Sequence, residues 1–562
     1  MQRPWLNSYS QDVPAQISPD DHGSLVDLLD RACKRHAKAI AFTAMGSDVE
    51  FQQVDAWGEA FACWLEARGV QQGERVALMM PNVPAYLAIL LGVLRKGCVV
   101  VNVNPLYTSD ELQRVLRDSG AQVIVILENF AHTLQAVKDK AALKHVVVTG
   151  PGDLLGPLKS KVINLGARYL KRMIPAWDIA GAWRLDTVLR QGAKGAYTRP
   201  VIGLGDLAVL QYTGGTTGTP KGAMLTHRNL VANVLQMDAV AYPALKDARG
   251  QQVMMTALPL YHIFALTVCG LYGLHRGMRN VLIINPRDLP TLVKAWREHP
   301  VTLFPAVNTL FNALVHNEAF AKLDFSALRL TIGGGMAVQR AVADRWFDLT
   351  GRVLIEGYGL SETSPLAAVN PADCTAYSGS IGLPVPSTDI AIMNDAGESL
   401  PLGEQGEIGI RGPQVMLGYW HNDAETAAAM TADGFFRTGD IGVMDERGYV
   451  RIVDRKKDMI LVSGFNVYPN EVEDAMASHP GILECAAVGV PDEHSGECVK
   501  IFVVKKDPAL TEADVLEWGK SKLTGYKRPR LVEFRTELPK TNVGKILRRE
   551  LREPDKPAKP AS

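Results

Sequence analysis

The chain has 562 residues, of which 47% are hydrophobic and 21% are charged. This composition is typical of a globular protein and excludes a largely disordered one. The 60 basic and 60 acidic side chains leave no formal net charge, so we expect no nucleic-acid partner. At about 100 to 200 residues per domain, the length predicts several lobes.

The cysteines and the apolar runs indicate the cellular compartment. The seven cysteines are scattered and form no C-x-x-C pair, which favours neither a disulfide framework nor a zinc site. The first residues lack the apolar core of a signal peptide. The longest apolar run, residues 83–94, is shorter than the roughly 18 to 20 residues of a membrane span. We therefore expect a cytoplasmic protein that does not cross a membrane.

Helical spacing alternates with short apolar runs in the first 150 residues. Residues 25–29 and 61–65 have helical spacing, whereas residues 76–80 and 98–103 are apolar, largely β-branched runs of strand length. Such alternation is typical of a mostly parallel sheet that is covered on both faces. We predict an α/β protein whose large N-terminal domain, residues 1–454, contains doubly wound sheets.

Residues 154–177 form a basic amphipathic segment without an acidic residue. Its cations are Lys159, Lys161, Arg168, Lys171 and Arg172. Such a segment can rest on the anionic inner surface of the membrane and make the protein peripheral to it. It can equally pack its apolar face on the body of the protein, and the sequence leaves both interpretations open.

Glycines and threonines surround a lysine directly after the strand-like run 207–212. The stretch consists of Tyr212, Thr213, Gly214, Gly215, Thr216, Thr217, Gly218, Thr219, Pro220, Lys221 and Gly222. Free N–H groups, hydroxyls and an ammonium suit a loop that holds phosphates, although an ordinary turn is the alternative. It is not a Walker loop, because Gly222 follows Lys221 where that motif needs Ser or Thr. The run 224–230 predicts a helix with Thr226 as its N-cap.

Two aromatic stretches, residues 258–264 and 302–308, end apolar runs. We predict that His262, Phe264, Phe304 and Asn308 line a cavity, with packing in the core as the alternative. No carboxylate close in sequence would orient His262 as a base, so we assign it to a wall or gate.

Glycines also end two later runs, 328–332 and 353–356. The residues at these junctions are Gly333, Gly334, Gly335, Gly357, Tyr358, Gly359, Glu362 and Thr363. Bare backbone accommodates a flat purine, and Tyr358 offers a ring for stacking. Glu362 offers a carboxylate to a magnesium ion, and Thr363 a hydroxyl to a phosphate. Ligands of open α/β sheets gather outside the carboxyl ends of strands, where these junctions lie.

The last third of the chain changes character twice. Short strands and turns over 380–454 predict a β-rich subdomain, in which Asp440 either accepts ribose hydroxyls or is structural. The charged run 454–458 predicts an exposed linker. Residues 455–562 predict a small α+β domain in which Lys545, on a flexible turn, reaches toward another lobe.

In this order, these motifs resemble the acyl-adenylate-forming superfamily of acyl-CoA synthetases, nonribosomal peptide adenylation domains and firefly luciferases. The motifs are YTGGTTGTPKG, GGGMA, EGYGLSET, FRTGDIG, DRKKD and LPKTNVGK, and they extend over nearly the whole chain. More narrowly, residues 82–84, 101–107 and 433–458 are similar to those of bacterial long-chain fatty acid CoA ligases.

The resemblance implies a two-step reaction with fatty acid, ATP and coenzyme A as ligands and Mg²⁺ as the metal. A fatty carboxylate attacks the α-phosphate of ATP to give acyl-AMP and pyrophosphate, and the thiol of CoA then displaces AMP. Because a carboxylate must approach a polyanion, cations are needed around the reacting centre. Homodimers occur among relatives, so a homodimer is an expectation by analogy.

The resemblance also implies a role for each motif residue. The loop 212–222 would hold the β- and γ-phosphates, Glu362 and Thr213 would bind magnesium, and Thr363 would touch phosphate. Tyr358 would stack on adenine in a frame made by Gly333, Gly334, Gly335, Glu356 and Gly357. Asp440 and Arg455 would hold the ribose, and Lys545 would bridge the carboxylate and the α-phosphate. Lys545, Lys221 and Glu362 are the expected catalytic residues.

In this superfamily the C-terminal domain rotates between the two steps. The pivot here would be residues 454–458, with Asp454 and Lys457 as hinge residues. Rotation would withdraw Lys545 and bring forward a CoA tunnel formed in part by Ser463, Gly464, Phe465 and Asn466.

Four other functions fit parts of the sequence. Medium-chain or aryl acids are alternative substrates, and an enzyme that stops at the adenylate is an alternative reaction. A luciferase-type oxygenase fits the fold. A catalytically silent acyl-binding protein would have lost Lys221, Glu362, Asp440 or Lys545, and all four are present.

Overall fold

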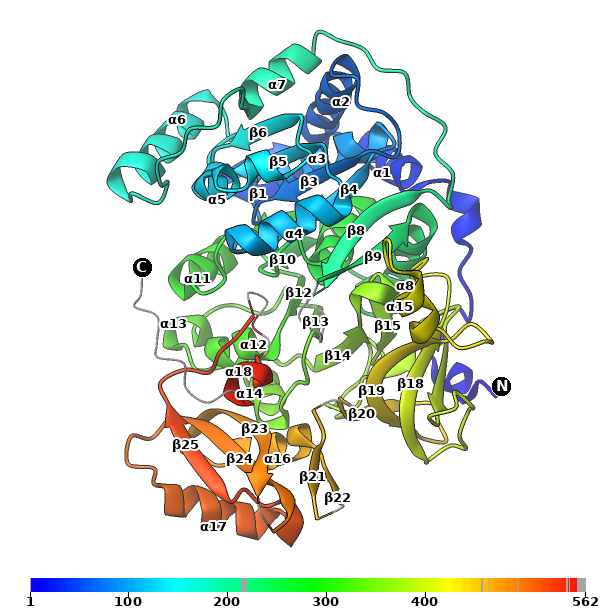
Figure 1. The fold of residues 1–562 in the computed structure, drawn as a ribbon, viewed down its shortest axis with the longest axis vertical. Coiled ribbons are helices and arrows are strands. Elements are labelled where there is room, and N and C mark those ends of the chain that lie inside the picture. Colours follow the sequence, from blue (N-terminus) through cyan, green and yellow to red (C-terminus); the bar gives the residue numbers. More distant parts are fainter. Residues whose placement is uncertain are drawn as a thin grey trace.

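The computed structural model describes residues 2–213, 220–455, 458–463, 465–492, 494–541, 544 and 546–552. Figure 1 shows these residues as sheets and helices stacked along the long axis of the molecule, with the C-terminal lobe at one end. The architecture is α/β, with a large N-terminal part and a smaller C-terminal one, which confirms the predicted fold class.

The first large sheet ends at the glycine-rich loop. Its strand order is β7-β6-β5-β3-β4-β8-β9, with β9 antiparallel to β8 and the other pairs parallel. The strands are β3 (Arg75–Met79), β4 (Val99–Asn102), β5 (Val123–Leu127), β6 (His145–Thr149), β7 (Trp183–Arg184), β8 (Leu207–Thr213) and β9 (Lys221–Thr226). Along β5, Val123 and Ile124 pack in different hydrophobic clusters. The sheet is therefore buried on both faces, as its β-branched runs indicate.

The second large sheet supplies the junctions that follow the loop in sequence. Its order is β16-β15-β14-β13-β12-β10-β11-β1-β2, and the run from β14 to β1 is parallel. The strands are β1 (Ile40–Ala44), β2 (Ser47–Glu50), β10 (Val253–Thr256), β11 (Arg279–Leu282), β12 (Leu303–Ala306), β13 (Leu330–Gly333), β14 (Leu354–Gly359), β15 (Leu366–Val369) and β16 (Leu383–Pro384). Because β12, β13 and β14 are neighbours and parallel, their carboxyl ends open at one edge.

Helices join and cover these sheets. They are α1 (Leu25–Arg35), α2 (Phe51–Ala67), α3 (Ala85–Arg95), α4 (Ser109–Ser119), α5 (Ala131–Gln135), α6 (Pro157–Leu165), α7 (Leu185–Gly192), α8 (His227–Leu245), α9 (Ile263–Ala265), α10 (Tyr272–His275), α11 (Leu289–Glu298), α12 (Asn308–Val315), α13 (Glu318–Ala321) and α14 (Arg340–Thr350). Helix α3 is buried along its whole length, and one hydrophobic cluster joins it to strands of both sheets. A helix that is apolar on every side belongs in such an interior position.

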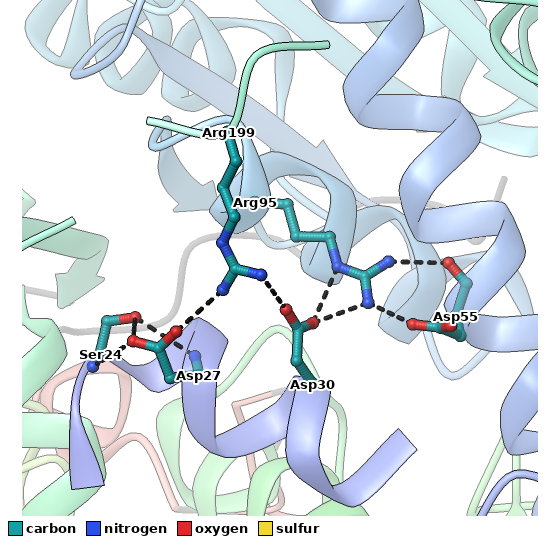
Figure 2. A network of polar contacts seen from close by, with 6 residues as sticks. All are labelled: Ser24, Asp27, Asp30, Asp55, Arg95 and Arg199. Atoms are coloured by element: carbon teal, nitrogen blue, oxygen red, sulfur yellow. Dashed lines mark hydrogen bonds and ion pairs between the residues drawn. The ribbon is translucent and has the colours of Figure 1, made fainter. Parts of the chain in front are cut away.

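A buried ionic network ties three helices to the connection that leads into β8. Figure 2 shows Arg95 between Asp30 and Asp55, and Arg199 between Asp30 and Asp27. Nitrogen–oxygen distances are 2.7 Å for Arg95–Asp30 and for Arg199–Asp30. Removing one partner of a buried pair costs about 3–5 kcal/mol, because a charge is left uncompensated. The network therefore fixes α1, α2 and α3 against the chain that enters β8.

Smaller sheets make up the rest of the chain. An antiparallel sheet contains β17 (Asp389–Met393), β18 (Gln405–Arg411), β19 (Phe436–Met444) and β20 (Val450–Arg455). The C-terminal sheet contains β21 (Ile460–Val462), β22 (Phe465–Val467), β23 (Ile482–Asp492), β24 (Gly496–Lys505) and β25 (Leu531–Arg535). The helices here are α15 (Asp423–Ala429), α16 (Pro469–Ala477), α17 (Glu512–Lys522) and α18 (Arg548–Arg552).

The basic amphipathic segment folds as α6 followed by a π-helical turn, η5 (Gly166–Leu170). Several of its apolar side chains face outward, and Leu158 and Leu170 are 78% and 86% exposed, whereas Leu155 and Ile174 are buried. Packing of the apolar face on the body of the protein is therefore wrong for the exposed side chains. Over the described residues, no helix combines the length and the apolar character that crossing a membrane requires.

Two local expectations need correction. The chain forms strand β9 before the predicted helix α8, although Thr226 caps α8 as predicted, accepting a hydrogen bond from the Asn229 N–H. The linker 454–458 is not exposed at Asp454, which is fully buried. Its carboxylate accepts from the Asn470 N–H at 2.8 Å, near the start of α16, and this hydrogen bond accounts for its burial.

Candidate active site

The glycine-rich loop connects two paired strands. Thr213 at the end of β8 faces Lys221 at the start of β9 across an antiparallel pair. Residues Gly214, Gly215, Thr216, Thr217, Gly218 and Thr219 lie outside the described residues. Lys221 is thereby held at the base of the loop, at the edge of the sheet.

The side chain of Tyr212 anchors β8. Its hydroxyl donates to the Asp118 carboxylate on α4 at 2.5 Å, and its ring lies against Gly222. A Cβ at Gly222 would come within 3.2 Å of that ring. Tyr212 therefore holds the strand beside the loop, and its hydroxyl is directed to α4.

Lys221 lies among partners that the sequence analysis did not single out. Its ammonium forms an ion pair with Glu425 on α15 and lies 5.4 Å from the centroid of the Tyr419 ring. The lysine side chain is 18% exposed, whereas that of Glu425 is 43% exposed. An exposed carboxylate is easily exchanged for another anion, so Lys221 is available to a phosphate.

Glu362 is a buried carboxylate next to the same two strands. It lies in a short 3₁₀ turn, η7 (Ser361–Thr363), which contacts β8 and β9. Tyr419 donates its hydroxyl to Glu362 Oε1 at 2.8 Å. Burial raises the pKa of Glu362, while the hydrogen bond from Tyr419 opposes that rise. The carboxylate is thus desolvated and oriented, as a metal or phosphate site requires.

Thr363 is fully buried, and the turn uses its hydroxyl. The Leu360 N–H donates to Thr363 Oγ1 at 2.9 Å, and this hydroxyl donates to the carbonyl of Pro365. A direct phosphate contact by Thr363 would need this turn to open.

Tyr358, Asp440 and Arg455 form a buried cluster. Asp440 lies opposite Arg455 in the β19–β20 pair, and its Oδ1 is 3.1 Å from the guanidinium. The Tyr358 hydroxyl donates to the other oxygen, Oδ2, at 2.6 Å. Asp440 is 3% exposed, so both of its oxygens are held in fixed directions. The structure thus brings together residues predicted to contact adenine and ribose.

Five glycines border this cluster. The residues are Gly333 at the end of β13, Gly334 and Gly335 directly after it, and Gly357 and Gly359 in β14. A Cβ at Gly334 would lie 3.0 Å from the Phe264 ring, and one at Gly359 would overlap the Pro365 carbonyl. Gly335 has φ +77°, which favours glycine.

Glu356 is buried at the same end of the sheet. Its carboxylate accepts from the Val338 N–H at 2.9 Å and from the Tyr377 hydroxyl at 2.9 Å. Burial raises the pKa of Glu356 to about 7. The sequence analysis did not predict a role for Tyr377. It lies 21 residues after Glu356 in no recognisable motif, and only the folded structure brings the two side chains together.

The residues predicted to line a cavity occupy different environments. Phe304 is fully buried in an aromatic cluster with Trp296, Phe311 and Trp346. Asn308 accepts from the Gln339 N–H at 3.1 Å. His262 caps α9 by accepting from the Phe264 N–H, and both side chains are partly exposed. Of this set, His262 and Phe264 are partly exposed, and Phe264 lies against the glycine junction at Gly334.

The turn that carries Lys545 docks on the N-terminal part, although Lys545 itself lies outside the described residues. Thr309 donates to the Gly544 carbonyl at 3.4 Å, and Val307 is the next neighbour. Val307 also lies 3.6 Å from the position of a Cβ on Gly335. The described residue next to Lys545 is therefore close to the glycine junction of β13.

Of the two predicted hinge residues, only Asp454 lies among the described residues. Lys457 lies outside the described residues. Asp454 is buried at the junction of the lobes, where its carboxylate accepts from the N–H groups of Arg455 and Asn470. Burial raises its pKa to about 6, while the charge of Arg548 opposes the rise.

The predicted CoA-tunnel residues lie on the β21–β22 hairpin. Phe465 is 57% exposed and stacks on Tyr526 with a centroid distance of 4.8 Å. Asn466 is exposed, and the Ser463 N–H donates to the Ser495 carbonyl at 2.7 Å. Gly464 lies outside the described residues. The hairpin thus presents exposed side chains at Phe465 and Asn466.

The oxygen donors present fit a magnesium ion that is bound together with ATP. Among the described residues, no three His, Cys, Asp or Glu side chains form a metal cage. Magnesium bound with nucleotides takes one or two protein oxygens and several from phosphate and water. Glu362 and Thr213, on adjoining elements, supply the oxygen types required.

Comparisons with known proteins agree with this geometry. A family model described as AMP-binding enzyme matches residues 29–420, and one described as AMP-binding enzyme C-terminal domain matches residues 471–545. A long-chain-fatty-acid–CoA ligase of Escherichia coli is 54% identical over 98% of both chains, and one of Salmonella typhimurium is 53% identical over the same shares.

A solved structure has the same fold over nearly the whole chain. An anthranilate CoA ligase in complex with anthranoyl-AMP has a TM-score of 0.83 and 26% identity, and covers 95% of this chain and 98% of its own. The family model covers more than half of the residues, and the relatives extend over the full length. The chain therefore belongs to the family of AMP-binding enzymes.

Proposed function

We propose that this protein joins long-chain fatty acids to coenzyme A, with ATP consumed through an acyl-AMP intermediate and released as AMP and pyrophosphate. The observation that carries the proposal is the 54% identity to a long-chain-fatty-acid–CoA ligase over 98% of both chains. The aligned region includes both the site around Lys221 and the buried cluster of Tyr358, Asp440 and Arg455.

The chain's own groups meet the requirements of adenylation. Asp440 would accept the ribose hydroxyls, with its direction fixed by Arg455 and Tyr358. Lys221 would leave Glu425 for the phosphates. Lys545 would reach the α-phosphate from the docked turn at Gly544. Two ammonium groups would thus offset the repulsion between the carboxylate and the triphosphate.

Magnesium would be held by Glu362, with Thr213 on the adjoining strand end. When bound, the ion neutralises phosphate charge and orients the leaving pyrophosphate. Glu362 is suited to this role because Tyr419 fixes one of its oxygens.

Thioester formation would follow a rotation of the C-terminal lobe about residues 454–458. The β21–β22 hairpin, with Ser463, Gly464, Phe465 and Asn466, would then border the path of CoA. Support comes from the exposed position of Phe465 in the docked arrangement, where the residue has no role in packing the N-terminal part.

The exposed segment 154–177 would bring the enzyme to the inner membrane surface, where its substrate dissolves. Leu158, Val162, Leu165, Tyr169, Leu170 and Met173 are more than half exposed. Lys161, Lys171 and Arg172 are exposed beside them, whereas Arg168 is paired with the buried Glu128. Apolar side chains flanked by free cations suit an anionic bilayer.

Mass spectrometry of the products tests the reaction and its chain length together. The purified protein is incubated with ATP, Mg²⁺, CoA and an equimolar mixture of fatty acids from six to eighteen carbons. We expect the long acids to be depleted into acyl-CoA, with AMP and pyrophosphate formed in equal amounts. Acyl-AMP without thioester would indicate an enzyme that stops at the adenylate, and depletion of the short acids would contradict the chain-length class.

A further inference from the structure

A short extended segment, residues 417–420, lies directly beside β9. The Met224 N–H donates to the Gly418 carbonyl at 2.9 Å, and the Trp420 N–H donates to the Gly222 carbonyl at 2.8 Å. Ala223 and Tyr419 form an isolated antiparallel bridge between them. Tyr419 is thus fixed through backbone hydrogen bonds to the strand that begins at Lys221.

The side chain of Tyr419 contacts both charged groups of the proposed phosphate site. Its hydroxyl donates to Glu362 Oε1 at 2.8 Å, and its ring lies 5.4 Å from the Lys221 ammonium. Tyr419 is 8% exposed and Glu362 is 9% exposed, so the contact between them is desolvated. A hydrogen bond to a buried carboxylate is stronger than one between neutral groups.

Helix α15 fixes this arrangement from the other side. The Tyr419 N–H donates to Thr426 Oγ1 at 2.9 Å, and Asn422 caps the helix by accepting from the Glu425 N–H. Glu425 holds the Lys221 ammonium by an ion pair while it lies over the ring. The backbone of Tyr419 and the charge of Lys221 are therefore fixed by one helix.

The hydroxyl and the ring of a tyrosine suit a positioning role at this place. The Tyr419 hydroxyl donates to Glu362 Oε1 and thereby fixes the direction of one carboxylate oxygen. The face of an aromatic ring attracts a cation, which favours an extended Lys221 side chain.

We propose that Tyr419 is a positioning residue for ATP, which orients the Glu362 carboxylate with its hydroxyl and the Lys221 ammonium with its ring. One side chain would then set the two opposite charges that meet the triphosphate and its metal. The inference deepens the proposed function and rests on it, because Glu362 and Lys221 are assigned to ATP there.

Calorimetric titration with a non-hydrolysable ATP analogue and Mg²⁺, without fatty acid, tests the hydroxyl. The variants are Tyr419→Phe, Glu362→Gln, and the two combined. We expect Tyr419→Phe to raise the Kd about 10- to 100-fold, the size of one hydrogen bond to a charged group. In the Glu362→Gln background the same change is expected to have less than about a twofold effect, because its partner is already altered.

Two further variants separate positioning from general packing. Tyr86→Phe is the matched control, since the Tyr86 hydroxyl is fully buried and donates to Asn102 Oδ1 at 2.6 Å, in the core between the sheets. It should lower Tm and leave the Kd unchanged. Tyr419→His keeps a ring and an N–H donor and should bind within about threefold of the wild type. If Tyr419→Phe does not fold, a loss of more than about tenfold in Tyr419→His would contradict the positioning role.

Three further results would contradict the positioning role alone, and one would contradict the proposed function as well. A Kd that Tyr419→Phe leaves unchanged, losses that add in the double variant, or an equal loss in Tyr86→Phe would overturn the positioning role while the proposed function stands. A wild-type chain that does not bind the analogue would overturn the proposed function, and the role of Tyr419 with it.

Discussion

The nucleotide end of the molecule and the contact between its lobes are held by different kinds of bond. At the nucleotide end, Asp440 is buried and accepts from Tyr358 at 2.6 Å. Between the lobes, Asn312 donates to the Leu483 carbonyl at 3.2 Å, and Thr309 donates to the Gly544 carbonyl at 3.4 Å. Long, partly exposed neutral hydrogen bonds contribute less than short buried ones to a charged group.

This difference indicates how one active site can serve two reactions. In the proposed function, the part that would bind AMP serves both steps and is fixed by buried charges. The lobe that carries Lys545 would be needed in this arrangement for the first step only, and away from the buried hinge residue Asp454 its described contacts include long neutral hydrogen bonds. A rotation of the lobe about the hinge would then leave the nucleotide site undisturbed.

Lys545→Ala is expected to have the largest effect, confined to one half-reaction. Acyl-AMP formation should fall at least about 100-fold, because the charge at the α-phosphate is lost. Thioester formation from supplied acyl-AMP should be nearly unchanged. Lys540→Ala is a matched control on the same turn, because Lys540 pairs with Glu484 within the C-terminal lobe, at 2.7 Å. Equal loss in both half-reactions would contradict the separation of the two regions.

Asp440→Asn tests the nucleotide end and should affect both half-reactions. It removes the charge that Arg455 faces and weakens the contact with ribose, so the KM for ATP should rise about 10- to 100-fold. The use of supplied acyl-AMP should weaken similarly, unlike in Lys545→Ala. Asp445→Asn, at a more exposed turn of the same sheet, is the control. A loss restricted to adenylation would show that this cluster is not shared.

The segment 154–177 forms a surface outside both the nucleotide end and the contact between the lobes. Changing Lys161, Lys171 and Arg172 to Gln should weaken binding to anionic liposomes on the order of 100-fold, at about 1 kcal/mol for each cation. Activity on a detergent-dispersed fatty acid should not change. Liposome flotation measures the effect, with Arg447, Lys520 and Lys522 changed to Gln as the control. Equal flotation of both variants would contradict a role in membrane contact.

The smallest expected effect is the pH dependence of stability that Asp454 causes at the junction of the lobes. The pKa of Asp454 is raised to about 6 from its ordinary value of 3.8, so the fold favours the protonated carboxyl. That contribution to stability is fully present below about pH 4 and is lost as the pH rises through about 6. Relative to Asp454→Asn, the Tm of the wild type should therefore fall by a few degrees between pH 5 and pH 7. Parallel Tm profiles of the two proteins would exclude a buried titrating group here.

Much of the fold and of the nucleotide site could be predicted because it depends on local sequence. β-branched runs such as 123–127 favour strands buried on both faces, and Thr226 caps its helix through a residue three positions away. Glycines at 333–335, 357 and 359 predict close backbone approach, and at Gly333, Gly334 and Gly359 the structure places a side chain or a carbonyl within 3.0 Å of where a Cβ atom would be.

Tertiary structure alone decided which distant side chains meet. Tyr419 and Glu425 lie about 200 residues after Lys221 and follow no spacing that marks them, yet the pairing of 417–420 with β9 brings them to it. The burial of Asp454 could not be read from a charged run, because α16 supplies the N–H group that satisfies it. Sequence alone determined the chemistry available to this protein, since it fixes residue types and local geometry. The three-dimensional fold determined its arrangement, since burial and long-range contacts decide where each charge is stable.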